Sequence, residues 1–501
     1  MQQKKITTSK ISAIFEGLSS LEIIAFVTIV TVGAISRAYF LNQPMRFDES
    51  ATVLSYINNN WLGLLNYTAP NNHLLNTVLI KFVTIIWGEH PMVIRLPAYL
   101  FGCASIVLTF IVCRSLGNSG WFATFMVATH PYLILFSANA RGYSALTFFT
   151  LLFLYISIRY IQTRNHRYSR HLGLIGAIGL FNLPIMLFPI FGITIWITVQ
   201  LWRKGELKPI LIRAFYLPFF VYGFIGCLTL YVPVLVVTGS LNGGLNAATQ
   251  MLFNNEFVSS NSSSFFITTL SSYMHNLARV YSQGISLWFI SIVVFLVVTA
   301  SIGDVRNRQY QTLDLLVFTT LGALLLFVAK HTFPYPRTWI FMLPVVAIIA
   351  DRGFGYLIGL SKTNAKWLCF CPAVMTILVI PTLMQDSRMS RYQDTGVFED
   401  APAIAKNIHY LLNTNDSVLA PTIPSNLPLY FYLWYEAKFN PKIAINNTPA
   451  NTFIFIPNDR IKLEMYAHPP HPIDISQLRN LHNNSEKVFE FNGSIIYKLK
   501  N

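Results

Sequence analysis

Charged residues are scarce in this chain: Asp, Glu, Lys and Arg make up 11% of its 501 residues, whereas soluble proteins have about 25%. This scarcity excludes an intrinsically disordered chain and leaves too few charges to cover a water-soluble globular surface. Hydrophobic residues make up 53% of the sequence, and the mean hydropathy is +0.48. Because these residues gather in long and numerous runs, the sequence predicts a protein that crosses a membrane several times.

Cysteine is also rare. The five cysteines lie in or beside apolar runs, which excludes a scaffold held by extracytoplasmic disulfides. Acidic residues are fewer than basic ones, 21 against 36, which gives a net charge of +15. The basic residues lie in short loops between apolar runs rather than on one face or arm, so we predict no nucleic-acid partner.

The apolar runs predict an all-α polytopic bundle of about eleven transmembrane helices. One further apolar stretch, 73–87, is short for a span and contains Lys81. We interpret it as a juxtamembrane helix on the outer face, preceded by another at about 50–66. The predicted spans are 22–41, 92–113, 119–137, 142–161, 172–186, 187–202, 214–237, 285–302, 313–330, 338–350 and 367–384.

The loop charges predict the orientation, because Lys and Arg are enriched in cytoplasmic loops. With 73–87 outside the bilayer, the N-terminal lysines and the basic loops near 159–170 and 203–213 fall on one side, the cytoplasm. The protein is therefore predicted to lie in the cell (inner or plasma) membrane with its N-terminus inside. The transmembrane domain covers 1–384.

The tail has a different composition. From about 385 the chain gains Pro, Asn, Asp and Lys and shows short strand-like stretches. We predict a small extracytoplasmic α/β domain over 385–501.

An acidic pair follows the first predicted span. Asp48 and Glu49 lie in an outer loop with few other acids. One interpretation is that either residue caps the following helix by accepting its free N–H groups. The other is that a carboxylate serves as a general base or electrostatic partner in an active site at the membrane surface.

Polar residues also mark two further outer segments. His73 opens the juxtamembrane helix that carries Lys81. The Lys81 side chain either extends to the interface or holds a lipid phosphate. Arg141 and Tyr143 lie between two predicted spans, where an Arg beside an aromatic residue is often only an interfacial anchor.

Cations gather at a later outer boundary. Lys330, His331 and Arg337 lie in one connection, against the tendency of basic residues to be inside. An anionic ligand explains them, since Lys and Arg pair well with phosphate. The predicted topology puts all these segments at one level, which suits a substrate with a lipid tail and a phosphate.

Four motifs in order resemble the GT-C superfamily of membrane glycosyltransferases, in its protein O-mannosyltransferase-like and aminoarabinose-transferase-like branch. They are the Asp48-Glu49 pair, Arg95-Leu96-Pro97 at the start of the second span, Arg141-Gly-Tyr143 with its flanks, and Pro334-Tyr-Pro336-Arg337 followed by Leu343-Pro344. A C-terminal outer α/β region is also common in that superfamily.

The resemblance implies an inverting transfer of a hexose or pentose from a polyprenyl-phosphate donor to an extracytoplasmic lipid, glycan or protein. Asp48 would be the catalytic carboxylate and Glu49 its support, while Lys81, Arg141 and Arg337 would bind the donor phosphate. Many relatives have an acidic residue where this chain has Asn139, so we predict no required metal and no cofactor. Relatives also often have His-Pro-Pro where this chain has His73-Leu-Leu.

Two other functions fit parts of the pattern. A transporter or flippase of lipid-linked sugars would share the spans and cations but would not need the acidic pair, and would usually show internal repeats. An O-antigen ligase or polymerase would carry essential Arg and His residues in a large late outer loop, whereas 239–280 contains only Glu256, His275 and Arg279 as charged or His residues.

Overall fold

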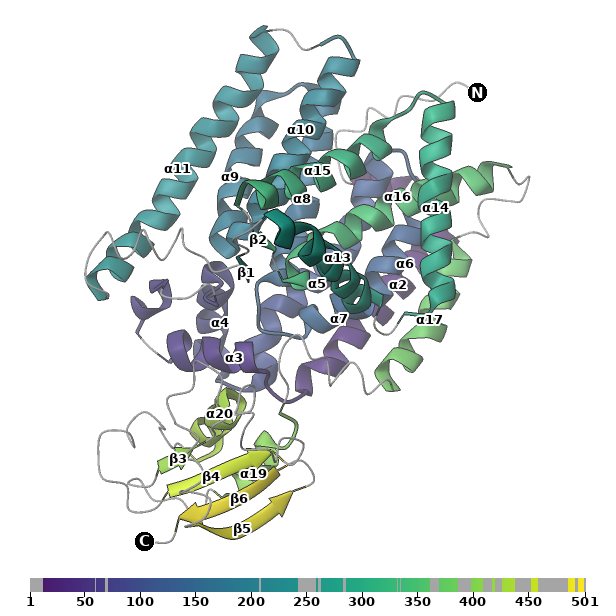
Figure 1. Cartoon of the computed structure of the whole chain (residues 1–501). Coiled ribbons are helices and arrows are strands. Elements are labelled where there is room, and N and C mark those ends of the chain that lie inside the picture. The colour runs from purple at the N-terminus through teal and green to yellow at the C-terminus, as the bar shows by residue number, and fades with distance from the viewer. Residues whose placement is uncertain are drawn as a thin grey trace. The chain divides into compact units, whose positions relative to one another are not determined.

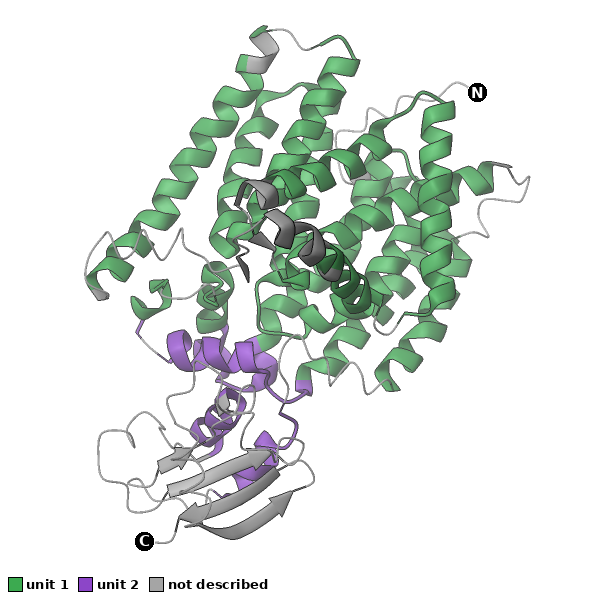
Figure 2. Ribbon diagram, viewed as in Figure 1, with its two compact units in different colours: residues 1–41, 61–82, 95–389 green, residues 42–60, 83–94, 390–501 purple. Residues whose placement is uncertain are grey.

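Contacts divide the chain into two units (Figure 2), and Figure 1 labels their helices and strands. Unit 1 comprises Met1–Leu41, Trp61–Phe82 and Arg95–Met389, and unit 2 comprises Asn42–Asn60, Val83–Ile94 and Ser390–Asn501. The structure is a computed structural model that describes residues 12–58, 60–67, 71–206, 209–241, 258–259, 263–282, 285–330, 332–333, 335–360, 369–385, 398–408, 417–419, 426–437, 452–457, 485–491 and 494–499.

Unit 1 is built from helices, and α4 and α5 also extend into unit 2. Two short strands, β1 (Val258–Ser259) and β2 (Thr332–Phe333), pair antiparallel within it. The helices are α1 (Ser12–Glu16), α2 (Ser20–Tyr39), α4 (Leu74–Trp87), α5 (Pro91–Ser115), α6 (Trp121–Thr129), α7 (Pro131–Ser137), α8 (Tyr143–Thr163), α9 (His166–Asn182), α10 (Leu187–Arg203), α11 (Pro209–Leu241), α13 (Ser263–Ser282), α14 (Leu287–Arg306), α15 (Gln311–Lys330), α16 (Met342–Leu360) and α17 (Phe370–Gln385), with the 3-10 turns η1 (Phe40–Asn42), η3 (Gly63–Leu65), η4 (Pro184–Met186) and η5 (Pro336–Phe341).

Seven helices among the described residues are long and apolar enough to cross a membrane. Seven of the predicted spans fall on these helices, and the described parts of the other four (119–137, 172–186, 313–330 and 367–384) fall on helices outside the seven. The seven are Ser20–Asn42, Pro91–Ser115, Tyr143–Thr163, Pro184–Arg203, Arg213–Ser240, Leu287–Arg306 and Pro336–Gly359, and the shorter apolar helices are Leu74–Trp87, Gln311–Leu325 and Phe370–Gln385.

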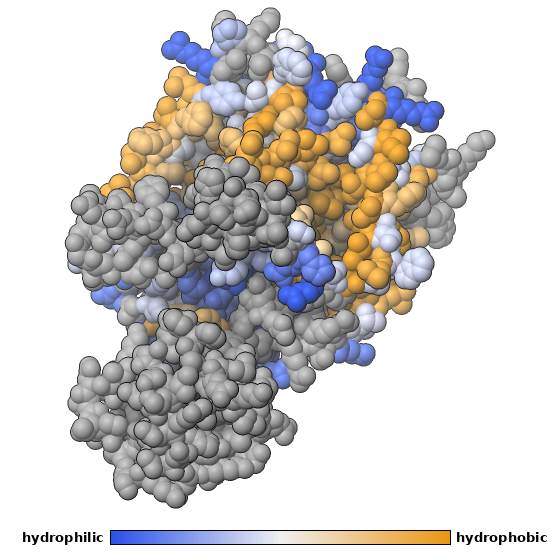
Figure 3. All heavy atoms as spheres, viewed as in Figure 1, coloured by the Kyte–Doolittle hydropathy of each residue, from blue (hydrophilic) through white to orange (hydrophobic). Residues whose placement is uncertain are grey.

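The surface of unit 1 fits a lipid environment. On the face drawn in Figure 3, hydrophobic residues form a broad band over the helices, with hydrophilic residues at its upper margin. Helix α11 contributes large exposed side chains to the apolar surface, among them Phe220, Phe224 and Val236. A soluble monomer rarely exposes so large an apolar area. The chain is a multi-pass membrane protein.

The structure agrees with the predicted bounds of one of the two juxtamembrane helices but not of the other. Helix α4 begins and ends within one residue of the predicted 73–87. The continuous helix predicted at 50–66 is wrong. The structure has α3 (Phe47–Thr52), a π-helical turn η2 (Val53–Ile57) and only the turn η3 beyond it. The sequence Asn58-Asn59-Asn60 and the glycine at 63 explain the interruption, because these residues disfavour helix.

The predicted span 119–137 is also two helices, α6 and α7, rather than one. Pro131 lacks an N–H group, so the carbonyl of Val127 loses its helical partner. Arg37 of α2 replaces it, donating to the Val127 carbonyl at 2.8 Å, the Ala128 carbonyl at 2.9 Å and Ser137 Oγ at 3.2 Å. One buried guanidinium thus joins α2 to both sides of the break.

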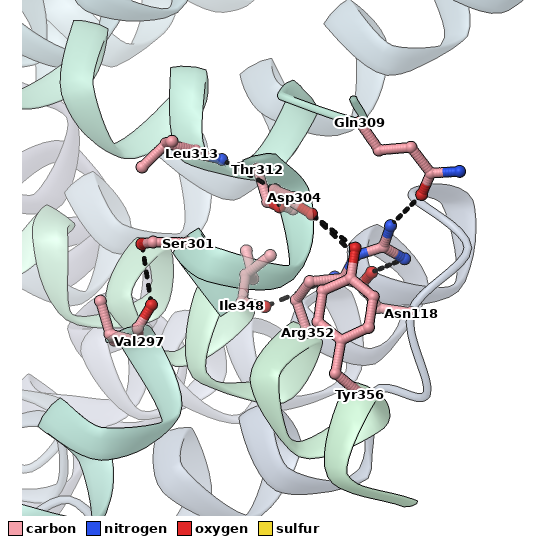
Figure 4. Close-up of polar contacts among 10 residues, drawn as sticks. All are labelled: Asn118, Val297, Ser301, Asp304, Gln309, Thr312, Leu313, Ile348, Arg352 and Tyr356. Atoms are coloured by element: carbon pink, nitrogen blue, oxygen red, sulfur yellow. Dashed lines mark hydrogen bonds and ion pairs between the residues drawn. The ribbon is translucent and has the colours of Figure 1, made fainter. Parts of the chain in front are cut away.

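A second buried polar network joins α14, α15 and α16 (Figure 4). The Asp304 carboxylate accepts from the Tyr356 hydroxyl at 2.8 Å, the Leu313 N–H at 3.3 Å and the Thr312 hydroxyl. It also pairs with Arg352 at 3.3 Å. A buried carboxylate with this many donors fixes the ends of three helices relative to one another.

Asp351, which precedes Arg352 in the chain, supplies the capping side chain that α6 lacks. The N-cap position is Gly120, which has no side chain to cap the helix and a φ of 84°. The buried Asp351 carboxylate accepts from the Gly120 N–H at 2.7 Å and the Phe122 N–H at 2.9 Å. A carboxylate at a helix N-terminus is favourable because it meets free N–H groups and the positive end of the helix dipole.

Unit 2 contains a four-stranded sheet of order β3-β4-β6-β5, in which β3 and β4 are parallel and the other pairs antiparallel. Helix α20 contacts both α19 and α3, and Tyr432 of α20 accepts the Met45 N–H at 3.0 Å. The elements are α19 (Ala401–Ile408), β3 (Ser417–Leu419), α20 (Asn426–Ala437), β4 (Thr452–Pro457), β5 (Ser485–Phe491) and β6 (Ser494–Leu499).

The role of Arg37 can be tested with Arg37→Met, which keeps an unbranched side chain but removes every donor. Leaving a buried acceptor unpaired costs about 1–3 kcal/mol, so we expect the free energy of unfolding to fall by roughly 2–5 kcal/mol. Thermal unfolding in detergent measures the change. The matched control is Arg114→Met at the end of α5, which is only partly buried. Equal effects of the two substitutions would contradict the role given to Arg37.

Candidate active site

The polar centre of unit 1 is the turn Asn139–Gly142, which connects α7 to α8. The Arg141 N–H donates to the Asn139 carbonyl at 2.6 Å, which makes the turn tight. Three side chains from other segments bind its backbone. Asn76 of α4 donates to the Ala140 carbonyl at 3.1 Å, Asn182 of α9 donates to the Gly142 carbonyl at 2.8 Å, and His73 Nδ1 accepts the Gly142 N–H at 2.7 Å.

Position 142 requires glycine because of this close packing. A Cβ there would lie 2.7 Å from Asn182 Oδ1 and 3.1 Å from His73 Nδ1. The absence of a side chain thus lets α9 and the start of α4 reach the same peptide group.

Arg141 is held over the turn. It is 3% exposed and donates from Nη1 to both the backbone carbonyl and the side-chain oxygen of Asn71. Its guanidinium carbon lies 5.8 Å from the centre of the Tyr143 ring, a cation–π distance. A buried guanidinium that is fixed by hydrogen bonds and ring packing is a preorganised partner for an anion.

His73 has a defined tautomer. Because Nδ1 accepts the Gly142 N–H, the neutral ring carries its proton on Nε2, which is therefore a donor. The Tyr143 ring packs edge to face against it, with centroids 5.1 Å apart. Burial lowers the pKa of His73 well below its usual value, and the charges of Arg141 and Arg337 lower it further. The imidazole is thus neutral beside two cations.

Arg337 comes from a distant segment. It lies in η5, which begins with Pro336, and its guanidinium stacks 4.7 Å from the centre of the Tyr335 ring. Tyr281 of α13 donates to the Pro336 carbonyl at 2.8 Å and fixes the start of this turn. The electrostatic effect of Arg337 on His73 places the two residues in one neighbourhood.

The structure thus brings together His73, Arg141, Tyr143 and Arg337, four of the residues singled out in the sequence. Lys81 lies about two helical turns beyond His73 on α4 and is half-buried. The side chain of Lys330 and the whole of His331 lie outside the described residues.

The acidic pair belongs to unit 2, where its two members have different surroundings. Glu49 is fully buried and accepts the Arg46 N–H at 2.9 Å, as the third residue of a capping box does. Asp48 is half-buried. The capping interpretation therefore applies to Glu49, and Asp48 is the better candidate for a reacting carboxylate. Within the described residues no three His, Cys, Asp or Glu side chains are grouped as metal ligands.

Sequence reasoning missed the asparagines that hold the turn. Asn76 lies in an apolar helix, and Asn182 precedes Leu183-Pro184, which marks only a break between spans. A polar side chain inside an apolar run is a usable signal, because it must find a partner there. The signal does not name that partner, since any backbone carbonyl can serve.

The neutral state of His73 predicts a pH dependence of stability. Its folded pKa is below that of an exposed imidazole, so the unfolded chain takes up a proton first as the pH falls through about 6.5. Stability is then lost toward acid, by up to about 1.4 kcal/mol per pH unit. His73→Asn keeps an acceptor for the Gly142 N–H and should reduce this loss between pH 7 and 5, measured by thermal unfolding. The exposed His171→Asn is the control; an unchanged slope in His73→Asn would contradict the burial of a neutral imidazole.

Comparisons with known proteins support a fold but no closer relationship. No protein-family model and no curated protein matches the sequence. The chain is similar to ArnT from Cupriavidus metallidurans bound to undecaprenyl phosphate, with a TM-score of 0.57, 11% identity, and coverage of 95% of this chain and 97% of that one. Its apo state gives a TM-score of 0.55, 12% identity and the same coverage. The chain therefore has the fold of ArnT, in agreement with the resemblance inferred from the sequence.

Proposed function

We propose that this protein transfers a sugar from a polyprenyl-phosphate donor to a lipid, glycan or protein acceptor on the extracytoplasmic side of the membrane. The proposal is carried by Arg141, which packs on the Tyr143 ring that contacts His73, together with the charges of Arg141 and Arg337, which both lower the pKa of His73. Two guanidiniums beside an uncharged imidazole form an anion site, and ArnT, which has the same fold, is described bound to undecaprenyl phosphate.

The proposed reaction is a single inverting displacement. The acceptor hydroxyl oxygen attacks the anomeric carbon, the bond from that carbon to the phosphate oxygen breaks, and polyprenyl phosphate leaves. Asp48 takes the proton of the hydroxyl as general base. The leaving phosphate gains one negative charge, which Arg141 and Arg337 stabilise. Lys81, Lys330 and His331 are further candidates for the same anion, and Tyr143 supports Arg141 through its ring.

The proposal includes an orientation. The N-terminus is cytoplasmic, the transmembrane domain covers 1–384, and the domain 385–501 and the active site are extracytoplasmic. Loop charges support it, because Arg159, Arg167 and Arg203 then lie inside. A cysteine placed at position 165 in a cysteine-free background should resist a membrane-impermeant thiol reagent added from outside.

The central experiment is incubation of the purified protein with a panel of polyprenyl-phosphate sugars and candidate acceptors. Release of polyprenyl phosphate together with a glycosylated acceptor supports a transferase. Movement of the donor across a vesicle membrane without release of polyprenyl phosphate would support a flippase instead. A flippase would not need Asp48.

Asp48→Asn tests the catalytic carboxylate. The amide is isosteric but cannot take a proton, and general base catalysis contributes about 10²–10⁴-fold, so transfer should fall at least that far. Donor binding should be retained, and helix α3 should keep its capping contact because Glu49 makes that contact. Glu436→Gln, an exposed change in α20, is the control. A variant that keeps more than about a tenth of the rate would rule out this role for Asp48.

Arg337 can be tested by donor binding. Removing a hydrogen bond to a charged group costs about 1.5–3 kcal/mol, so Arg337→Ala should weaken the affinity for a non-transferable polyprenyl-phosphate analogue by that amount. Arg337→Lys should also lose activity, because an ammonium cannot reproduce the planar fork of the guanidinium. The exposed Arg279→Lys of α13 serves as control. If both Arg337 variants bind like the wild type, Arg337 is only an interfacial anchor.

A further inference from the structure

Three buried asparagines contact or form the Asn139–Gly142 turn, and each keeps side-chain atoms without a hydrogen-bond partner among the residues that the structure describes. These atoms are Oδ1 of Asn76, Oδ1 of Asn182, and both Oδ1 and Nδ2 of Asn139. All three residues are at most 1% exposed. Asn139 differs from the other two because its whole carboxamide is unused.

The orientations of two of these amides are set by the turn. Asn76 and Asn182 give their N–H groups to the carbonyls of Ala140 and Gly142, which accept only. Their oxygens therefore remain as acceptors. Together the three asparagines leave three acceptor oxygens and one donor amide around a single turn.

This arrangement is costly for the protein alone. A buried donor or acceptor without a partner costs about 1–3 kcal/mol, whereas an apolar residue of the same shape at the position of Asn139 would carry no such cost. Buried polar atoms that the fold does not use are therefore expected to meet a bound group.

The unused atoms define the chemistry of that group. A phosphate offers only acceptors, so it cannot pair with three amide oxygens, and it already has Arg141 and Arg337 nearby. An ammonium would pair with the oxygens but is repelled by the same two guanidiniums. A neutral hydroxyl both donates and accepts, and two neighbouring hydroxyls match the oxygen and the N–H group of one carboxamide.

We propose that Asn139 binds the hydroxyl groups of the transferred sugar, with Asn76 and Asn182 accepting from further hydroxyls. The inference rests on the proposed function and adds the substrate class: a neutral polyhydroxylated sugar rather than one with a free amine at this contact. Asn139 is thus a specificity-determining residue beside the phosphate site, two residues before Arg141 in the chain.

The test compares the bare lipid phosphate with three sugar-bearing forms of it. Binding of undecaprenyl phosphate, and of undecaprenyl phosphate bearing mannose, glucose or arabinose, is measured for the wild type, for Asn139→Leu and for the smaller Asn139→Ala. The wild type should bind at least one sugar-bearing lipid more tightly than the bare lipid. In both variants the ratio of the affinity for the sugar-bearing lipid to that for the bare lipid should fall about tenfold, while the affinity for the bare lipid stays the same. Asn139→Leu should not lower the melting temperature.

Asn118→Leu is the matched control, because this buried asparagine has both ends paired, with the Ile348 carbonyl and with Arg352. It should lower the melting temperature and keep the ligand preference. The inference is overturned if Asn139→Leu is destabilised as Asn118→Leu is, which would indicate an internal water or structural role. It is also overturned if the Asn139 variants keep the preference, or if they lose the bare lipid equally.

Failure of the proposed function has a different signature. The wild type would then transfer no sugar to any acceptor, although the preference for a sugar-bearing lipid and its loss in the Asn139 variants would still support the sugar contact.

Discussion

The candidate site depends on how one turn satisfies its backbone. The Asn139–Gly142 peptide groups are buried, so each needs a partner other than water. His73, Asn76 and Asn182 supply these partners from the start of α4 and the end of α9. The same three bonds bring distant segments together and fix the tautomer of His73. Hydrogen bonds to the backbone thus assemble the site from contacts within the protein itself.

The same requirement organises the rest of unit 1. Pro131 frees a carbonyl inside an apolar bundle, and Arg37 binds it. Gly120 leaves α6 without a cap, and Asp351 provides one. In each case a charged residue that sequence statistics would treat as out of place in a membrane segment pairs with unsatisfied backbone groups. Arg37 also reaches Ser137, so the bond that stabilises the helix break also supports the start of the turn.

The sequence predicts the coarse architecture because apolar length is a strong signal. The extent of helix α4 matches its prediction, and the charges of the distant residues Arg141 and Arg337 both act on His73. The break at Pro131 and the short α3 were not predicted, because apolar content does not distinguish one helix from two. Asn76 and Asn182 were missed since their partners are carbonyls, which leave no pattern in the sequence. The acidic pair was ambiguous until burial separated the capping Glu49 from Asp48.

The neutrality of His73 has a consequence for the proposed reaction. A donor phosphodiester carries one negative charge, and the departing polyprenyl phosphate carries one more. Two guanidiniums therefore match the total of two negative charges on the departing phosphate, and their stabilisation grows as the bond breaks. Burial keeps the imidazole uncharged, and its Nε2–H remains available as a neutral donor beside Arg141. The site thus separates charge, carried by arginines, from hydrogen bonding, carried by the imidazole and the asparagines.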